Sequence, residues 1–305
     1  MNSSAHSKTT LYSLLSLAWP IIVSRSTQVV VGLSDALMVA HLGESVLASV
    51  TAGAMNSFAA FIFPMGIVFI VSSFSSQLAG KGEAASARRY GWYGLGVATF
   101  AQLLALVMIP ALPTLLGLFK YEPEVMSGLQ AYLAIRLLST GTGVGIEALG
   151  NYYGGLGNTS ILMKANLTAM SLNVGLNWCL IDGHLGFPAW GLEGAAWASV
   201  ISTSLAFGGF FLVFILQGRG LAAAKLNLAE FLRMLRFGVP SGFNWAFEFF
   251  AFITFINIVV AGLGTRMPRT CARPTVTATG PAIAAPAWAS ASLGQSVDAS
   301  FTALR

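Results

Sequence analysis

The chain has 305 residues and a formal net charge of +5, and 55% of its residues are hydrophobic while only 9% are charged. Its mean hydropathy is +0.73. Because a soluble domain typically carries about 25% charged residues, this composition excludes the soluble globular class. The basic residues lie in short segments between apolar stretches rather than along one face, so no nucleic-acid partner is expected.

Long windows without formal charge indicate membrane-spanning helices, since about 20 such residues cross a bilayer. Transmembrane barrels show short alternating segments instead. The sequence therefore predicts an all-α, polytopic transmembrane helix bundle whose main partner is the lipid bilayer. The uncharged windows are Ser45–Gly80, Tyr90–Phe119, Ala165–Ile181 and Gly194–Gly218.

In chain order, we expect a cytoplasmic tail at 1–10, six transmembrane helices within 11–218, a cytoplasmic linker at 219–230 and a seventh helix within 231–264. The segment 265–305, rich in Arg, Pro, Ala, Thr and Ser, is expected to be disordered. The predicted helices cover Leu11–Ala40, Val46–Leu78, Tyr90–Leu118, Gly128–Tyr153, Ser160–Ile181, Gly191–Leu216 and Phe231–Leu263.

Basic residues concentrate in alternate loops, and this asymmetry predicts the orientation. Lys81, Arg88 and Arg89 follow the second predicted helix, and a further basic group precedes the seventh. The other loops hold only Lys120. The positive-inside rule therefore places the N-terminus in the cytoplasm of a multi-pass protein of the plasma or inner membrane.

Asp35 lies in an otherwise apolar helix, Pro20 to Gly43. An ionisable side chain there costs roughly 2.5–3.5 kcal/mol on insertion scales, so it indicates ion or substrate handling. Arg25, ten residues earlier, is too far along the helix for a direct contact. Because burial disfavours the charged form, Asp35 is a candidate for binding and releasing a proton.

A second unit repeats this pattern. Pro240 opens a helix that carries Glu248 and ends in Leu-Gly, as Pro20 opens the helix that carries Asp35. Both carboxylates are expected to be buried. This repeated sequence pattern, which recurs after six helices, suggests the start of a second structural repeat. Such repeats are common in transporters.

Five stretches together resemble the multidrug and toxic compound extrusion (MATE) transporters, in particular the NorM-like and DinF-like branches. The resemblance covers roughly residues 11–264. The stretches are AWPIIVSRSTQVVVGLSDALMVAHLG, AGKGEAASARRYGWYGLG, GGLGNTS, LNVGLNWCLIDGHLGFPAWGLEGAAWASVIS and FGVPSGFNWAFEFFAFITFINIVVAGLGT.

This resemblance implies twelve helices in two six-helix lobes, alternating access, and export of organic cations and other amphipathic compounds against inward H+ or Na+. Asp35, Asn173, Asn177 and Ser199 fall at the positions of the family's N-lobe cation site, and Glu248 at an acidic position in the seventh helix. Some relatives have a second aspartate where this chain has Asn177. The asparagine argues against a Na+ site built on two carboxylates.

Other residues leave alternatives open. Asn173 and Asn177 share a helix face and either assist ion binding or make ordinary interhelical hydrogen bonds. Glu147 is a second proton site or, as we slightly prefer, forms a buried pair with Arg136. Tyr152, Tyr153, Trp190 and Trp197 are expected as interface anchors. The candidates for a substrate path, which could equally be packing residues, are Met55, Asn56, Phe58 and Phe61.

The sequence contains no catalytic motif, and its only cysteines, Cys179 and Cys271, offer neither a disulfide framework nor a metal cluster. We therefore expect no enzyme activity and no cofactor beyond H+ or Na+ as coupling ion. The predicted function is cation-coupled export of amphipathic or cationic small molecules. The alternative is a truncated, transport-inactive fragment of such an exporter, and the oligomeric state is not readable.

Overall fold

The computed structural model describes residues 3–117, 122–217 and 226–264, with side chains from residue 15 to residue 255. These residues form an all-α fold, as predicted, and no strand occurs among them. The α-helices are α1 Ser3–Val39, α2 Glu44–Gly80, α3 Ala84–Met108, α4 Leu112–Leu116, α5 Pro123–Arg136, α6 Thr140–Gly155, α7 Thr159–Ile181, α8 Gly191–Gln217 and α9 Leu228–Gly264. Short 3-10 turns lie at η1 Ala40–Leu42, η2 Ile109–Ala111, η3 Leu137–Ser139 and η4 His184–Gly186.

The helices correspond in order to the seven predicted ones, because η2 joins α3 to α4 and η3 joins α5 to α6. Three helices begin five or more residues before the predicted start, and one of them is the third, which begins at Ala84 instead of Tyr90. The first helix begins at Ser3 instead of Leu11. The fourth begins at Pro123 instead of Gly128, because proline is preorganised for the first helical turn. The tail 265–305 and most of the linker, 218–225, lie outside the described residues.

The prolines differ in their effect on helix geometry. Pro20, Pro64 and Pro240 are accommodated inside α1, α2 and α9. Pro110 lies in η2, where the third helix tightens from α-helical to 3-10 geometry. This local change is expected where a proline removes a backbone donor.

Among the described residues, four helical segments are long and apolar enough to cross a membrane, judged by length and composition. They are Leu15–Leu42, Glu44–Gly80, Ala84–Leu116 and Gly191–Gln217. The other described helices also carry polar side chains. Among these are Arg136 and Glu147 in α5–α6 and three asparagines in α7. Buried polar side chains thus occur on helices of both groups, and α1 and α8 of the apolar group carry Asp35 and Ser199.

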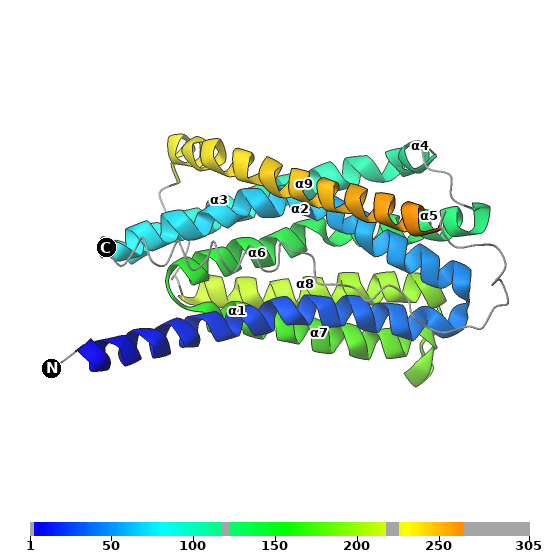
Figure 1. Cartoon of the computed structure of the whole chain (residues 1–305), viewed down its shortest axis with the longest axis horizontal. Helices are drawn as coiled ribbons and strands as arrows, with labels where there is room; N and C mark the ends of the chain where they lie inside the picture. Colours follow the sequence, from blue (N-terminus) through cyan, green and yellow to red (C-terminus); the bar gives the residue numbers. More distant parts are fainter. Residues whose placement is uncertain (1–2, 118–121, 218–225, 265–305) are drawn as a thin grey trace.

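The helices run lengthwise beside one another (Figure 1). α7 packs against α1 and α8, while α2 packs against α6, α9, α3 and α5. The main core lies where α2, α3, α6 and α8 meet, and its fully buried side chains include Val68, Val71, Val144, Leu149 and Phe214.

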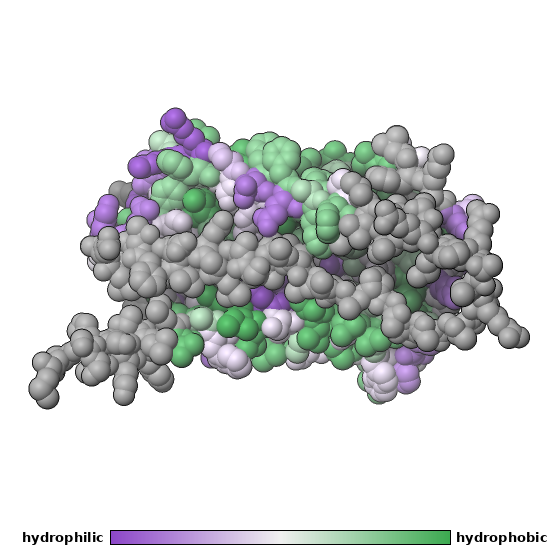
Figure 2. All heavy atoms as spheres, in the orientation of Figure 1, coloured by the Kyte–Doolittle hydropathy of each residue, from purple (hydrophilic) through white to green (hydrophobic). Residues whose placement is uncertain are grey.

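The outer surface is apolar along the sides of the helices. Phe100, Val107 and Leu216 are about 70% exposed, at 68%, 70% and 69%. In Figure 2 hydrophobic residues cover much of the visible bundle, and the hydrophilic residues gather mostly toward its two ends. Such a surface is stable against lipid tails and unfavourable in water.

The expectation that Tyr152 and Tyr153 anchor the membrane interface is wrong, because both are buried in the main core. Tyr153 stacks on Phe210 with ring centroids 5.6 Å apart. Its hydroxyl donates to Gln217 Oε1 at 2.8 Å. The two tyrosines lie on the faces of α6 that meet α3 and α8, so they fill the core and not the interface. Trp190, which is 45% exposed near the start of α8, agrees better with the expectation.

Close approach of glycines joins α9 to α2. A Cβ atom added at Gly66 would lie 2.7 Å from the Cα atom of Gly242, and one added at Gly242 would lie 2.8 Å from the carbonyl oxygen of Phe63. Backbone atoms cannot move aside as a flexible side chain can. The absence of side chains at these two positions is therefore what lets the helices touch.

We predict that Gly66→Ala lowers the free energy of unfolding by about 1–3 kcal/mol, because overpacking forces α2 and α9 apart. The matched control is Gly208→Ala, where a Cβ meets nothing within 4 Å. This control is expected to leave stability unchanged or raise it by up to about 1 kcal/mol. Thermal unfolding in detergent measures both, and equal stability of the two variants would contradict the packing argument.

Candidate functional site

Asp35 is buried at 5% exposure where α1 lies against α7 and α8. Both of its oxygens accept hydrogen bonds. Asn177 Nδ2 on α7 donates to Oδ1 at 2.5 Å, and Ser199 Oγ on α8 donates to Oδ2 at 3.2 Å. The carboxylate therefore links three helices through charge-assisted hydrogen bonds, which are stronger than neutral ones.

Two further hydrogen bonds connect the side chains that surround Asp35. Asn177 Nδ2 also donates to Asn173 Oδ1 at 3.3 Å, and Asn173 Nδ2 donates to Ser199 Oγ at 3.0 Å. Asn173, Asn177 and Ser199 are 1%, 0% and 2% exposed. The structure thus brings together four of the residues that the sequence analysis selected. We call Asp35, Asn173, Asn177 and Ser199 the Asp35 cluster.

The chemistry of the Asp35 cluster is that of a site for a proton or a hard cation. It offers one carboxylate, two amide oxygens and one hydroxyl, all oxygen ligands of the kind that hard cations prefer. Asn177 Oδ1 is buried without a hydrogen-bond partner. Among the described residues, no group of three or more His, Cys, Asp or Glu side chains could hold a metal ion.

Glu147 forms a buried ion pair, but its partner is not the one that the sequence suggested. Arg25 on α1 donates from Nη1 to Oε1 at 3.0 Å and from Nη2 to Oε2 at 3.2 Å, and Gln28 Nε2 adds a bond at 3.2 Å. The preferred pairing with Arg136 is wrong, because Glu147 bonds to Arg25 and Gln28 instead. Eleven helical residues place the backbones of residues 136 and 147 about 16 Å apart along the axis. Only the packing of the bundle reveals Arg25 as the partner.

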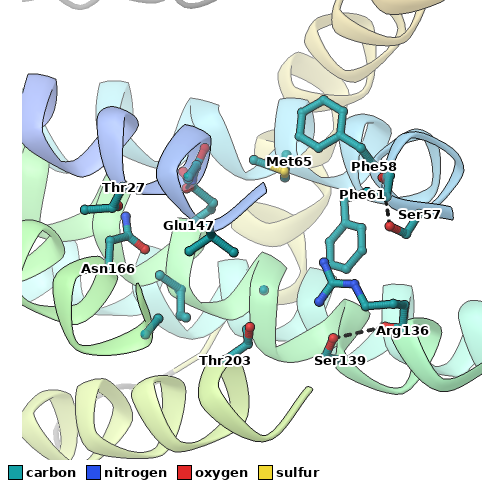
Figure 3. A pocket seen from close by; sticks show the side chains of 16 residues that line it. Thr27, Ser57, Phe58, Phe61, Met65, Arg136, Ser139, Glu147, Asn166 and Thr203 are labelled. Carbon is teal, nitrogen blue, oxygen red and sulfur yellow. Dashed lines mark hydrogen bonds between the residues drawn. The ribbon is translucent and has the colours of Figure 1, made fainter. Parts of the chain in front are cut away.

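A cavity of about 230 Å³ lies between α1, α2, α6 and α7 (Figure 3). Arg136 extends into it from the end of α5, beside the ring of Phe61. Among the described side chains no acid forms an ion pair with Arg136, and its buried Nε has no hydrogen-bond partner. The full lining is Thr27, Gln28, Val31, Ala54, Ser57, Phe58, Phe61, Met65, Arg136, Ser139, Gly143, Ile146, Glu147, Asn166, Ala169 and Thr203.

Two of the four candidates for a substrate path line the cavity and two do not. Phe58 and Phe61 line the cavity, as does Met65, which the sequence analysis did not select. Residues 58, 61 and 65 share one helix face, so their spacing was the available signal. Met55 is 44% exposed and Asn56 bonds its own helix through the carbonyl of Ala52, and neither lines the cavity.

Glu248 does not join the Asp35 cluster, and the expectation that it is buried is wrong. It is exposed on α9. The face of α9 that packs on α2 carries Gly242, Ala246 and Phe249, at helical spacing. Glu248 lies off that face. Residue spacing alone could not show which side of α9 the rest of the bundle covers.

We predict that Arg25→Leu lowers the free energy of unfolding by about 3–5 kcal/mol, because it leaves the buried Glu147 carboxylate without its ion-pair partner. The double variant Arg25→Leu/Glu147→Leu is expected to recover most of this loss, since no charge is then left unpaired. Unfolding in detergent measures both. If the double variant is as unstable as the single one, the pair is not what holds α1 to α6.

Comparison with known proteins shows where such a bundle occurs. Residues 20–179 match the MatE family. The probable multidrug resistance protein NorM of Chromobacterium violaceum is 28% identical over 265 residues, which is 82% of this chain and 55% of that protein. The protein of the same name from Rhizobium meliloti is 31% identical over 196 residues, covering 64% of this chain and 41% of that protein. The chain spans about half the length of these relatives.

Solved structures share the fold. A crystal structure of a MATE protein in complex with MaL6 superposes with a TM-score of 0.69 at 23% identity, covering 81% of this chain and 55% of that one. An outward-facing multidrug resistance MATE transporter gives a TM-score of 0.65 at 22% identity, with the same coverages. The family match spans more than half of the sequence, and the described residues of this chain form several apolar helices of membrane-spanning length. This multi-pass membrane protein therefore belongs to the multidrug and toxic compound extrusion (MATE) family.

Proposed function

We propose that this chain forms the N-terminal six-helix lobe and seventh helix of a cation-coupled antiporter that exports drugs or other toxic organic compounds. The observation that supports this most directly is the Asp35 cluster. A single carboxylate is held away from water by donors from two other helices. Such an arrangement is costly in an apolar bundle and is characteristic of ion pathways.

The coupling step follows from the hydrogen bonds of Asp35. When Asp35 is ionised, Asn177 and Ser199 donate to its two oxygens and hold α1 against α7 and α8. An arriving cation neutralises the carboxylate and changes what these donors can bond. An ion moves a conformational equilibrium only by binding the two states differently, and this rearrangement supplies that difference.

The coupling ion is H+ or Na+. A proton needs only the carboxylate, and Asn177 in place of a second acid leaves the Asp35 cluster with one formal negative charge. A sodium ion would need several oxygens, which the carboxylate, the two amides and the hydroxyl offer. Imposing a pH gradient and a Na+ gradient in separate experiments distinguishes the two.

We also propose that the N-terminus faces the cytoplasm of a cell membrane. The start of α3 and the start of α9 lie at the end of the bundle from which the N-terminus emerges (Figure 1). Arg89 on α3 pairs with Glu230 on α9 at 3.4 Å, so the first turns of these two helices, near which Arg88, Arg89 and Arg233 lie, meet at one end. This grouping supports the positive-inside assignment.

The second candidate function is that of a transport-inactive membrane fragment. It is favoured by the exposure of Glu248 and of Phe247 and Phe250 on α9, which the described helices leave uncovered. In a complete exporter these side chains would face further helices. Glu248 therefore stays a candidate for ion coupling that is separate from the Asp35 cluster. Within the six-helix lobe, Asp35 is the carboxylate to which we assign ion coupling.

We predict that Asp35→Asn abolishes gradient-driven dye efflux from liposomes that contain the purified chain, because the amide cannot take up the coupling ion. The matched control is Asp182→Asn, at the end of α7, where the carboxylate is partly exposed and pairs with His41 at 2.9 Å. This control is expected to retain efflux.

Unchanged efflux in Asp35→Asn at equal protein content would overturn the coupling assignment. If the folded wild-type chain itself shows no efflux under either gradient, the fragment interpretation is correct. Circular dichroism and size-exclusion chromatography establish folding before reconstitution, so that loss of transport is not confused with loss of structure.

A further inference from the structure

The cavity beside Phe61 is lined by a positively charged side chain that forms no ion pair with any described side chain. Two charged side chains line it, Arg136 and Glu147. Glu147 is neutralised locally by the bidentate contact with Arg25 and by Gln28. Arg136 has no such partner among the described side chains, and its Nε makes no hydrogen bond.

A negative charge outside the cavity also acts on Arg136. Asp35 interacts electrostatically with Arg136, but it is hydrogen-bonded within the Asp35 cluster and does not line the cavity. The donors of Arg136 are therefore free to bind something else. A guanidinium presents a planar fork of donors that matches the two oxygens of a carboxylate.

The rest of the cavity suits a small aromatic body. Phe58, Phe61 and Met65 form an apolar wall on α2, and Thr203 and Asn166 add polar groups on the opposite side (Figure 3). The volume of about 230 Å³ is below the range of about 300–1,000 Å³ typical of sites for drug-sized ligands. A one- or two-ring compound fits this volume better than a large one.

We propose that this cavity binds small aromatic carboxylic acids, with the carboxylate held by Arg136 and the ring packed against Phe58, Phe61 and Met65. The statement that such acids are exported rests on the function proposed above. The binding itself does not, because it requires only the folded lobe.

The negative charge on Asp35 also affects which compounds bind in the cavity. A negative charge on Asp35 opposes the entry of an anion and favours that of a cation. Neutralising Asp35 therefore strengthens the binding of an acid and weakens that of an organic cation. The two classes of compound are expected to respond in opposite directions to the same substitution.

The test is equilibrium binding of three matched probes to the purified full chain in lipid nanodiscs, measured by isothermal titration calorimetry. The probes are 2-naphthoate, the neutral 2-naphthamide and the cationic 2-naphthylmethylammonium. Wild-type protein is expected to bind the acid at least about tenfold more tightly than the amide, the size of one charge-assisted interaction. Asp35→Asn is expected to increase this preference.

Arg136→Gln is expected to abolish the preference for the acid. Arg136→Lys is expected to keep part of this preference, because lysine has the positive charge but lacks the planar pair of donors of a guanidinium. The control is Arg236→Gln, an exposed arginine on α9 away from the cavity, which should behave as wild type. Equal affinity of wild-type protein for acid and amide would overturn the proposal without any variant. So would an unchanged preference in folded Arg136→Gln.

These outcomes are independent of transport. A chain that binds 2-naphthoate through Arg136 but shows no efflux supports the binding site and contradicts the exporter. A chain that shows Asp35-dependent efflux of cationic dyes but no preference for the acid contradicts the binding site and leaves the exporter intact.

Discussion

The structure depends on how one carboxylate is buried in an apolar helix bundle. An isolated charge in such surroundings is expensive, and it persists only when hydrogen-bond donors compensate for lost water. Asn177 and Ser199 supply those donors from α7 and α8. Because both donors must reach Asp35 together, they constrain how α1 lies against α7 and α8. The geometry of the polar site and the packing of these helices therefore depend on each other.

The same constraint accounts for the second buried acid. Glu147 on α6 is met by Arg25 and Gln28 on α1, so α1 is tied by polar contacts to α6 at one level and to α7 and α8 at another. Apolar packing alone would let α1 slide or rotate at small cost in lipid, where the hydrophobic effect does not drive helices together. The buried polar contacts give α1 a defined rotation.

In the exporter proposed above, a bundle organised in this way would join the coupling-ion site to the ligand cavity. Arg136 lines the cavity and interacts with Asp35 through space, and Glu147 lines the cavity while bonded to the helix that carries Asp35. Neutralising Asp35 therefore changes both the field in the cavity and the contacts of α1. This is the physical link that an ion-coupled transporter requires between its two sites.

The sequence by itself determined the membrane environment, the helix order and the members of the Asp35 cluster. Hydropathy and charge report the surrounding solvent directly, and residues 173 and 177 share a face by the helical repeat alone. The resemblance to a known family supplied the grouping of Asn173, Asn177 and Ser199 with Asp35, which no local pattern shows.

Only the tertiary structure decided which charges meet and which faces are covered. Arg25 and Glu147 are 122 positions apart, and no local periodicity relates residues on different helices. The same limit explains the exposure of Glu248 and the burial of Tyr152 and Tyr153, since burial depends on which helix lies alongside. Neighbours along a helix are set by its repeat, but neighbours across helices are set by packing.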